Sequence, residues 1–245
     1  MGKLKPRAII FDLGSTLIEY EATPWDELGV ISVENGRKYL KKKGIEVIDS
    51  EPFLGAFDEV KLAYRREASE TLIEWSVPQV VRDLFRKLKL DEDDRLIQGF
   101  FDAYYDKVAE QLYVYDDTLA TLERLREAYP TIGLVSNTIF PERVHHTELN
   151  RFGIAPYLDF TVFSSTVGVR KPHEDIFIKA TNLAGQAPSD CVYIGDRYYE
   201  DVHGPKQLGM AAILKVKPGR EYPEEMPLAD RRIDKLSELF EHIEG

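Results

Sequence analysis

The sequence contains a single cysteine, Cys191, so no disulfide can form within the chain. Cys191 opens the apolar run Cys191–Ile194, and a free cysteine in such a run behaves as a small buried hydrophobic residue. We therefore expect a structural thiol and a fold stabilised by its hydrophobic core. The 43% content of hydrophobic residues is sufficient for a sizeable core.

The sequence also lacks a long apolar run. No stretch is long enough to span a bilayer, and the start, Met-Gly-Lys-Leu-Lys-Pro, has none of the apolar character of a secretory signal. The sequence therefore predicts a cytoplasmic, soluble protein with no membrane partner.

Positive charge is in deficit, because 32 lysines and arginines face 43 aspartates and glutamates and the formal net charge is −11. This balance argues against binding to nucleic acids or to anionic membranes. It does not exclude a small anionic substrate, because one lysine and a metal ion can reverse the sign locally.

From about residue 116, apolar runs of strand length alternate with amphipathic helical patterns. We expect strands at 8–11, 132–137, 160–164, 192–195 and 211–216. We expect helices from a cap at 116–118, from Pro141 to Gly153, from Pro172 to Gly185 and from about Tyr199 to Leu208. A last amphipathic helix would bury Ile233, Leu236, Leu239, Phe240 and Ile243. This alternation predicts an α/β fold with a doubly wound parallel sheet, formed by residues 1–17 and 116–245.

Residues 18–115 break this rhythm with helical patterns only, at 25–43, 53–75, 77–88 and 95–114. We interpret them as an inserted all-helical domain, with hinges near 17–24 and 113–116. An aromatic stripe at helical spacing within it is expected to be core: Phe100, Phe101, Tyr104 and Tyr105.

Polar residues follow four of the predicted strands. Because the carboxyl ends of parallel strands meet at one edge of a sheet, we expect these side chains to converge there: Asp12, Ser136, Asn137, Lys171, Asp196 and Asp201. Carboxylate oxygens suit a hard cation, Mg²⁺ before Zn²⁺, and a hydroxyl with a lysine suits a phosphate group. A carboxylate beside both is a candidate nucleophile.

Three histidines are expected to lie away from this chemistry. His145 and His146 are predicted on a solvated helix face, and His173 on the surface of a first helical turn.

The chain resembles the haloacid dehalogenase-like superfamily. Four segments carry the resemblance, which covers essentially the whole length of the chain. The segments occur in the family's order: Phe-Asp-Leu-Gly-Ser-Thr-Leu at 11–17, Val-Ser-Asn-Thr at 135–138, Gly-Val-Arg-Lys-Pro-His-Glu-Asp-Ile-Phe at 168–177 and Gly-Asp-Arg-Tyr-Tyr-Glu-Asp-Val-His-Gly at 195–204. The resemblance implies a Rossmann-like core, and residues 18–115 would be the family's cap domain.

The resemblance also implies a role for each residue of the expected site. Asp12 would be the nucleophile and a Mg²⁺ ligand, together with the backbone carbonyl of Gly14. Ser136 and Lys171 would hold the transferring phosphoryl group, with the Asn137 amide nearby. Asp196 would bind Mg²⁺, and Asp201 would support the metal site or orient Lys171.

The chain departs from the family at Gly14, where phosphatases of the family carry a second aspartate. That aspartate protonates the leaving alcohol and then activates water, and such help is typically worth ~10²–10⁴-fold in rate. One interpretation is a slow or specialised phosphatase, with Glu19 or Glu21 as a substitute acid. Another is a phosphonate hydrolase that forms an imine on a lysine of the cap, such as Lys38, Lys41, Lys42 or Lys43.

A third interpretation is a 2-haloacid dehalogenase, which would need no metal. Retention of Asp196 and Asp201 argues against it, because two unneeded carboxylates would repel the charge of the nucleophile. A fourth is a metal- or phosphate-binding interaction module with little turnover. A signalling receiver domain is disfavoured by the inserted helices, and a nicotinamide enzyme by the absence of Gly-x-Gly-x-x-Gly after the first strand.

We expect a Mg²⁺-dependent hydrolase that acts on a small phosphorylated metabolite through an aspartyl-phosphate on Asp12, with a cap that closes over the cleft. Nothing in the sequence indicates an oligomeric state.

Overall fold

The computed structural model describes residues 2–244 and divides into two compact units. The first unit combines the chain up to Glu19 with the chain from Tyr113 onward, and the second holds Tyr20–Leu112.

Among the described residues, six strands form one sheet in which every neighbouring pair is parallel. The spatial order is β5-β4-β1-β6-β7-β8. The strands are β1 Ala8–Phe11, β4 Thr131–Ser136, β5 Phe160–Phe163, β6 Cys191–Gly195, β7 Ala211–Lys215 and β8 Arg231–Ile233. All four residues of β1 are buried, as expected for an inner strand covered on both faces.

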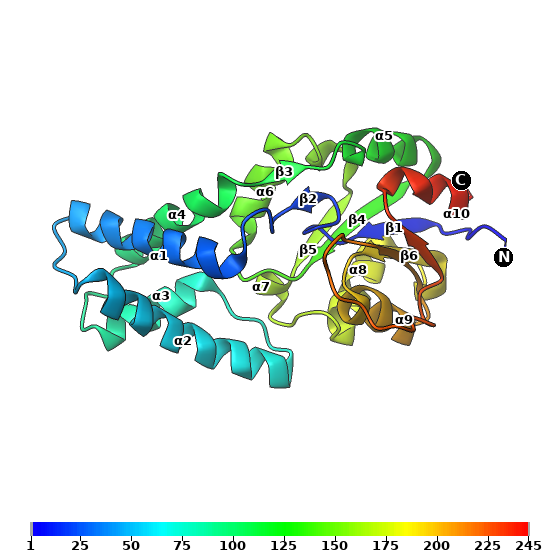
Figure 1. The fold of residues 1–245 in the computed structure, drawn as a ribbon. Coiled ribbons are helices and arrows are strands. Elements are labelled where there is room, and N and C mark those ends of the chain that lie inside the picture. The colour runs from blue at the N-terminus through cyan, green and yellow to red at the C-terminus, as the bar shows by residue number, and fades with distance from the viewer. Residues whose placement is uncertain (1, 245) are drawn as a thin grey trace. The chain divides into compact units, whose positions relative to one another are not determined.

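Helices cover both faces of this sheet. They are α5 Thr118–Ala128, α6 Glu142–Arg151, α7 Ser164–Val167, α8 Glu174–Ala184, α9 Gly204–Gln207 and α10 Leu239–His242. Figure 1 shows α8 and α9 on one face and α5 and α10 on the other. Alternate strand residues such as Ile10 and Tyr193 pack against Phe177 of α8, so strand periodicity divides the core into two layers. The predicted doubly wound α/β fold is confirmed.

The predicted C-terminal amphipathic helix is wrong. Ile233 ends β8, Leu236 lies in a 3₁₀ turn, and only Leu239 and Phe240 belong to the short α10. The helical spacing of the apolar residues arises here from three short elements in succession. The end of β8, the 3₁₀ turn and α10 each bury an apolar residue, at intervals close to those of one continuous helix.

The predicted helix at about 199–208 is also irregular. Residues Tyr198–His203 form a π-helical segment, and α9 follows directly. This local widening lies at the end of β6, where it carries Asp201.

In the second unit, which the structure describes throughout, four helices account for most of the chain. They are α1 Trp25–Lys42, α2 Ser50–Thr71, α3 Val77–Lys87 and α4 Asp94–Ala109. Local signals start two of them. Ser76 and Gln79 form a capping box at α3, and the Asp93 carboxylate accepts two backbone N–H bonds at α4.

The aromatic stripe of α4 is core, as predicted: Phe100, Phe101, Tyr104 and Tyr105 are at most 6% exposed. α1 packs against α4 with Gly36 facing the ring of Phe100, and a side chain at position 36 would overlap that ring. The glycine therefore sets how closely these two helices approach.

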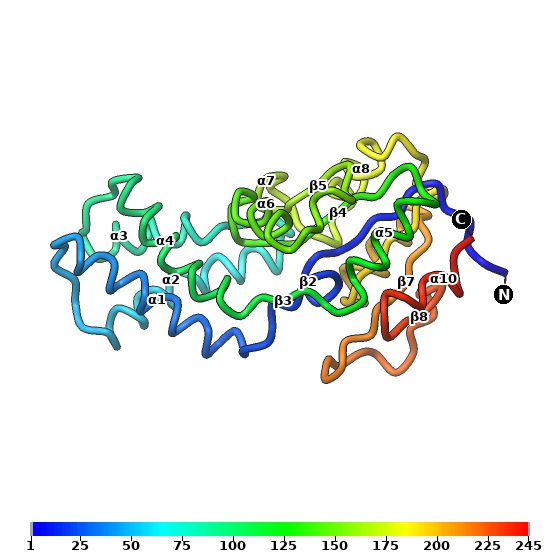
Figure 2. Tube along the Cα trace, turned by 90° about the horizontal axis from the view of Figure 1, so that it is seen from above, coloured from blue at the N-terminus to red at the C-terminus, as the bar shows by residue number. Residues whose placement is uncertain are grey.

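Two strands of two residues each lie where the sequence predicted hinges. β2 Ile18–Glu19 pairs antiparallel with β3 Tyr113–Val114, at the points where the chain leaves the first unit and returns to it (Figure 2). Strands this short carry no periodicity, so the pairing was not predictable from the sequence.

Two expectations can be compared with the structure: the one about the single cysteine and the one about the lack of a long apolar run. Cys191 is a free thiol and is buried, as predicted. No helix in the described part of the chain combines the length and the apolar character that a membrane crossing requires.

A partly buried ion pair stabilises the helical unit. Arg37 donates to both carboxylate oxygens of Glu34, at 2.8 and 2.9 Å, and the Ser50 hydroxyl donates to Oε2 at 2.8 Å. The bonds from Arg37, aided by that from Ser50, lower the pKa of Glu34 from 4.5 to about 2.

We expect Glu34→Gln to lower the free energy of unfolding of this unit by about 1 kcal/mol at pH 7, because solvent screens part of the interaction. Since the folded pKa lies below the unfolded one, the contribution is present above about pH 4.5 and is lost as the pH falls towards 2. Trp25 and Trp75 both lie in this unit, so urea unfolding followed by tryptophan fluorescence measures it. Exposed Glu46→Gln is the control, and a Glu34→Gln deficit unchanged at about pH 2 would contradict the ion pair.

Candidate active site

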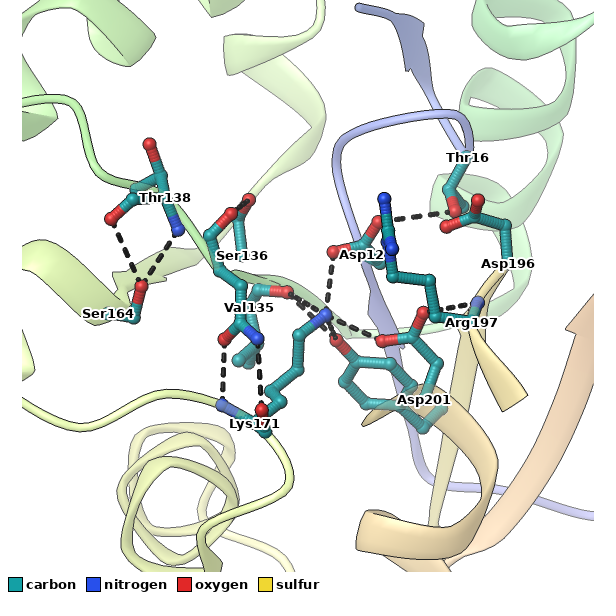
Figure 3. Close-up of polar contacts among 12 residues, drawn as sticks. Asp12, Thr16, Val135, Ser136, Thr138, Ser164, Lys171, Asp196, Arg197 and Asp201 are labelled. Carbon is teal, nitrogen blue, oxygen red and sulfur yellow. Dashed lines mark hydrogen bonds and ion pairs between the residues drawn. The ribbon is translucent and has the colours of Figure 1, made fainter. Parts of the chain in front are cut away.

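Residues from the ends of neighbouring strands lie together at one edge of the sheet. The order β4-β1-β6 places Ser136, Asp12 and Asp196 at or directly after the ends of adjacent strands. Lys171 comes from the segment before α8, and Asp201 from the π-helical segment after β6 (Figure 3). This edge is where open parallel sheets place their functional sites.

The Lys171 ammonium group is the centre of the arrangement and is buried, with 2% of its side chain exposed. Its Nζ donates to Asp12 Oδ1 and Asp201 Oδ1, each at 2.6 Å, and to the Tyr193 hydroxyl at 2.9 Å. Two carboxylates therefore share one cation away from solvent.

Burial and charge act in opposite directions on these groups. Burial raises the pKa of Asp12 to about 6, although Lys171 opposes the rise. Burial alone would lower the pKa of Lys171, but Asp12 and Asp201 raise it well above its usual value. At pH 7 the ammonium stays protonated and Asp12 is mostly ionised.

Tyr193 is a site residue that the sequence reasoning missed. Its hydroxyl accepts from Lys171 and donates to the Val135 carbonyl at 2.8 Å, which ties β6 to β4 beneath the lysine. Burial holds the pKa of Tyr193 well above its usual value, so the hydroxyl stays a donor. A tyrosine inside a fully apolar strand was a usable signal, because a buried phenol needs a hydrogen-bond partner.

Asp201 is fully engaged by protein donors. Oδ1 accepts from Lys171, and Oδ2 accepts from the Arg197 backbone N–H at 2.8 Å. The carboxyl packs directly on Gly195, where any side chain would overlap it. The absence of a side chain at Gly195 is thus a steric requirement for placing Asp201 beside Lys171.

Asp196 has a different environment. It is fully buried, and it has no contact with Lys171 among the hydrogen bonds of the described residues. Its charge is met by the guanidinium of Arg220, which forms an ion pair with Oδ2. Oxygens of Asp12, Asp196 and Asp201 all lie within 4.8 Å of one another, a donor set that fits a hard divalent cation.

Ser136, the last residue of β4, and Asn137, which follows it, have different hydrogen bonds. Asn137 clamps the backbone of Lys171, since its Nδ2 donates to the Lys171 carbonyl at 3.0 Å and its Oδ1 accepts from the Lys171 N–H at 2.7 Å. The buried Ser136 hydroxyl makes a long 3.4 Å bond to the Asn137 carbonyl and is not part of the Lys171 network.

The turn after Asp12 is compact. The N–H groups of Leu17 and Ile18 both donate to the Leu13 carbonyl, and Gly14 lies opposite Ile18 in an isolated bridge. Ser15 has a φ of 59°, a left-handed conformation that costs a residue with a side chain. Thr16 donates to Asp12 Oδ2 over 3.4 Å, a weak bond that leaves this oxygen little engaged.

Glu19 lies behind this turn and is buried. It accepts from the Tyr115 hydroxyl at 2.5 Å, from Lys217 Nζ at 3.0 Å and from the Ser15 hydroxyl at 3.4 Å. Two hydroxyl groups and one ammonium group therefore occupy the oxygens of the Glu19 carboxylate. Lys38 and Lys41–Lys43 of the second unit are exposed on and just after α1.

The prediction for His145 is wrong, because its side chain is 2% exposed. It lies between Thr138 and Glu148 and stacks on Phe163. His146 is exposed as predicted, and His173 caps α8 by accepting the Asp175 N–H at 3.2 Å. The helical pattern at 141–153 did not predict this burial because the residue that covers the His145 ring, Phe163, comes from β5.

A family model described as haloacid dehalogenase-like hydrolase matches residues 6–209. The chain is a haloacid dehalogenase-like hydrolase. Its similarity to curated relatives extends over nearly the whole length: it is 28% identical to the glyceraldehyde 3-phosphate phosphatase of Methanopyrus kandleri, over 97% of each chain. It is 26% identical to the Pyrococcus furiosus protein of the same name, over 97% of this chain and 93% of the relative.

Solved structures of this family share the fold. A phosphatase of the family from Thermococcus onnurineus matches with a TM-score of 0.66 and 26% identity, over 96% of both chains. A 2-haloacid dehalogenase from Pseudomonas syringae matches with a TM-score of 0.73 and 21% identity, over 96% of this chain and 97% of that one.

For this hydrolase we expect Lys171→Met to lower the free energy of unfolding by about 3–5 kcal/mol at pH 7, because two buried carboxylates lose their counter-charge. Removal of Lys171 also removes the interaction that opposes the raised pKa of Asp12, so this pKa rises further and the deficit shrinks as the pH falls and Asp12 takes up a proton. Urea unfolding at about pH 7 and pH 5, with chelator present, measures both effects.

Lys206→Met is the matched control, since Lys206 pairs with Asp230 at 2.8 Å while about a quarter of each side chain is exposed. We expect a loss of about 1 kcal/mol there. An equal loss in both variants would contradict the dominant role of the buried lysine.

Proposed function

We propose that this hydrolase is a Mg²⁺-dependent phosphatase that cleaves small phosphate monoesters through an aspartyl-phosphate on Asp12. The observation that carries the proposal is the contact of Asp12 with Lys171 at a strand end, beside the fully buried carboxylate of Asp196. A nucleophile, a cation for phosphoryl oxygens and a candidate metal ligand thus share one small volume.

The proposed reaction has two displacements at phosphorus. A carboxylate oxygen of Asp12 forms a bond to phosphorus as the bond to the leaving oxygen breaks. Water then attacks the acyl phosphate, which releases inorganic phosphate and restores Asp12. Lys171 already holds Asp12 Oδ1 and would neutralise charge on the equatorial phosphoryl oxygens. Ser136 and the backbone N–H groups after β4 would bind the same oxygens.

Asp12, Asp196 and the Gly14 carbonyl would hold Mg²⁺, with Asp201 as a further carboxylate beside them. The bound ion would supply positive charge for the phosphoryl oxygens and orient the ester. Asp201 already accepts from Lys171 and from the Arg197 N–H, which favours its role in orienting Lys171.

Proton transfer is where the proposed enzyme differs from phosphatases of its family. Gly14 offers no side chain to protonate the leaving alcohol, and Glu19 is occupied by three donors. We infer a preference for leaving groups of low pKa, or slow turnover of ordinary alkyl phosphates.

The substrate class follows from the relatives. Several that match over much of this chain are named glyceraldehyde 3-phosphate phosphatase, so a phosphorylated three-carbon sugar is the first metabolite to test. Release of inorganic phosphate in Mg²⁺ and in chelator tests the metal requirement. Halide release from a 2-haloacid without Mg²⁺, or an imine trapped by borohydride, would instead assign a dehalogenase or a phosphonate hydrolase.

We expect Asp12→Asn to lower turnover of p-nitrophenyl phosphate by about 10³-fold or more, because the amide cannot form the acyl phosphate. Exposed Asp91→Asn is the control for loss of one negative charge. Retained activity in Asp12→Asn would exclude the covalent mechanism. A wild-type protein that binds phosphate but turns over no ester would assign the binding-module interpretation.

We expect Gly14→Asp to raise turnover, by up to about 10²-fold for alkyl phosphates and much less for p-nitrophenyl phosphate, because only poor leaving groups need an acid. The measurement is kcat/KM for a series of esters against the pKa of the leaving alcohol. An unchanged slope would mean that another group already supplies the proton.

A further inference from the structure

A chain of buried polar groups lies behind the loop that follows β4. Thr138, His145 and Glu148 are 8%, 2% and 3% exposed. Thr138 Oγ1 lies 2.7 Å from His145 Nε2, and His145 Nδ1 lies 2.8 Å from Glu148 Oε2. Burying a carboxylate and an imidazole costs free energy. A role is therefore expected for a buried chain that leads from Glu148 through His145 to the Thr138 hydroxyl.

The hydrogen bonds at Thr138 hold its hydroxyl in place. Oγ1 accepts the Phe140 N–H at 3.0 Å, which closes a turn within the loop. His145 Nε2 bonds to the same oxygen, and Nδ1 of the ring bonds to the Glu148 carboxylate. His145 and Glu148 therefore hold the position of one hydroxyl, and that hydroxyl closes the turn.

The backbone of the same loop is held from α7. The Thr138 N–H donates to Ser164 Oγ at 2.8 Å, and the Ser164 hydroxyl donates back to the Thr138 carbonyl at 3.2 Å (Figure 3). Ser165 donates to the Phe140 carbonyl at 2.8 Å. Residues 138–140 are thus held at two places. His145 of α6 bonds to the Thr138 side chain, and the serine hydroxyls of α7 bond to the main chain of the loop.

The braced loop continues directly into the active site. Ser136 and Asn137 precede Thr138, and Asn137 clamps both backbone polar groups of Lys171. A shift of the loop would move Ser136 and the Lys171 segment together, and displacements of about 1 Å at a reacting centre can cost 10²-fold in rate.

We propose that His145 and Glu148, acting through the Thr138 hydroxyl, are positioning residues that hold Ser136, Asn137 and Lys171 in the geometry that binds the phosphoryl group. The proposal rests on the proposed phosphatase function and adds to it a set of residues that touches no substrate. Figure 3 shows Thr138 and Ser164 on the β4 side of the site, set back from the Lys171 ammonium group.

The decisive variant is Thr138→Val, which keeps the shape of the side chain and removes the hydroxyl. We expect kcat/KM for p-nitrophenyl phosphate to fall by about 10- to 100-fold and the inhibition constant of inorganic phosphate to rise by about 10-fold, measured well below the unfolding temperature. Thr138→Ser restores the hydroxyl and should recover most of both values. Glu148→Gln keeps the shape without the charge and should give an intermediate loss; it decides the matter if Thr138→Val does not fold.

Thr181→Val is the matched control. Thr181 is 4% exposed, and its hydroxyl bonds within α8 to the Ile178 carbonyl at 3.1 Å. We expect it to lose stability as Thr138→Val does, with phosphate inhibition unchanged. Equal effects of the two variants on phosphate binding, or wild-type values in both Thr138→Val and Glu148→Gln, would overturn the proposal.

Failure of the proposed function gives a different result. If the wild-type protein hydrolyses no phosphate ester, calorimetric titration with inorganic phosphate replaces kinetics, and a 10-fold weaker affinity in Thr138→Val still supports the positioning role. A wild-type protein that binds no inorganic phosphate overturns both proposals.

Discussion

The buried ammonium group of Lys171 is the constraint on which the rest of the site depends. A cation with 2% of its side chain exposed is tolerable only with counter-charge at hydrogen-bond distance, and Asp12 and Asp201 supply it at 2.6 Å each. The Tyr193 hydroxyl accepts the third hydrogen bond from the ammonium group. These requirements explain why β6 carries a tyrosine among apolar residues and why Gly195 leaves room for Asp201.

The sheet topology makes this pairing possible. β1, which leads to Asp12, lies between β4, which ends at Ser136, and β6, which leads to Asp196. The lysine itself enters from a loop, and loops need support to place a group accurately. Asn137 provides the nearest support, and the buried Thr138, His145 and Glu148 lie directly behind it. In the proposed phosphatase, these polar groups would hold the reacting atoms in place without touching the substrate.

In the proposed phosphatase, the binding of a phosphoryl group is better provided for than proton transfer to a leaving alcohol. Gly14 has no side chain, and Glu19 is committed to Ser15, Tyr115 and Lys217. Membership of the haloacid dehalogenase-like hydrolases accounts for the fold and the strand-end chemistry. The environment of position 14 would set how that chemistry is used, through its effect on which leaving groups depart.

The sequence alone determined the α/β fold, the four inserted helices and the aromatic core of α4, because strand and helix periodicities and caps act over short distances. It also placed Asp12, Ser136, Lys171 and Asp196 at or near strand ends. Only the tertiary structure decided which other side chains contact the residues at those strand ends. Tyr193 joined Lys171, Asn137 clamped a backbone 34 residues away, and His145 became buried, because each depends on packing between distant segments. The C-terminal residues formed β8 and short turns for the same reason: pairing with β7 outweighed the helical spacing of five apolar side chains.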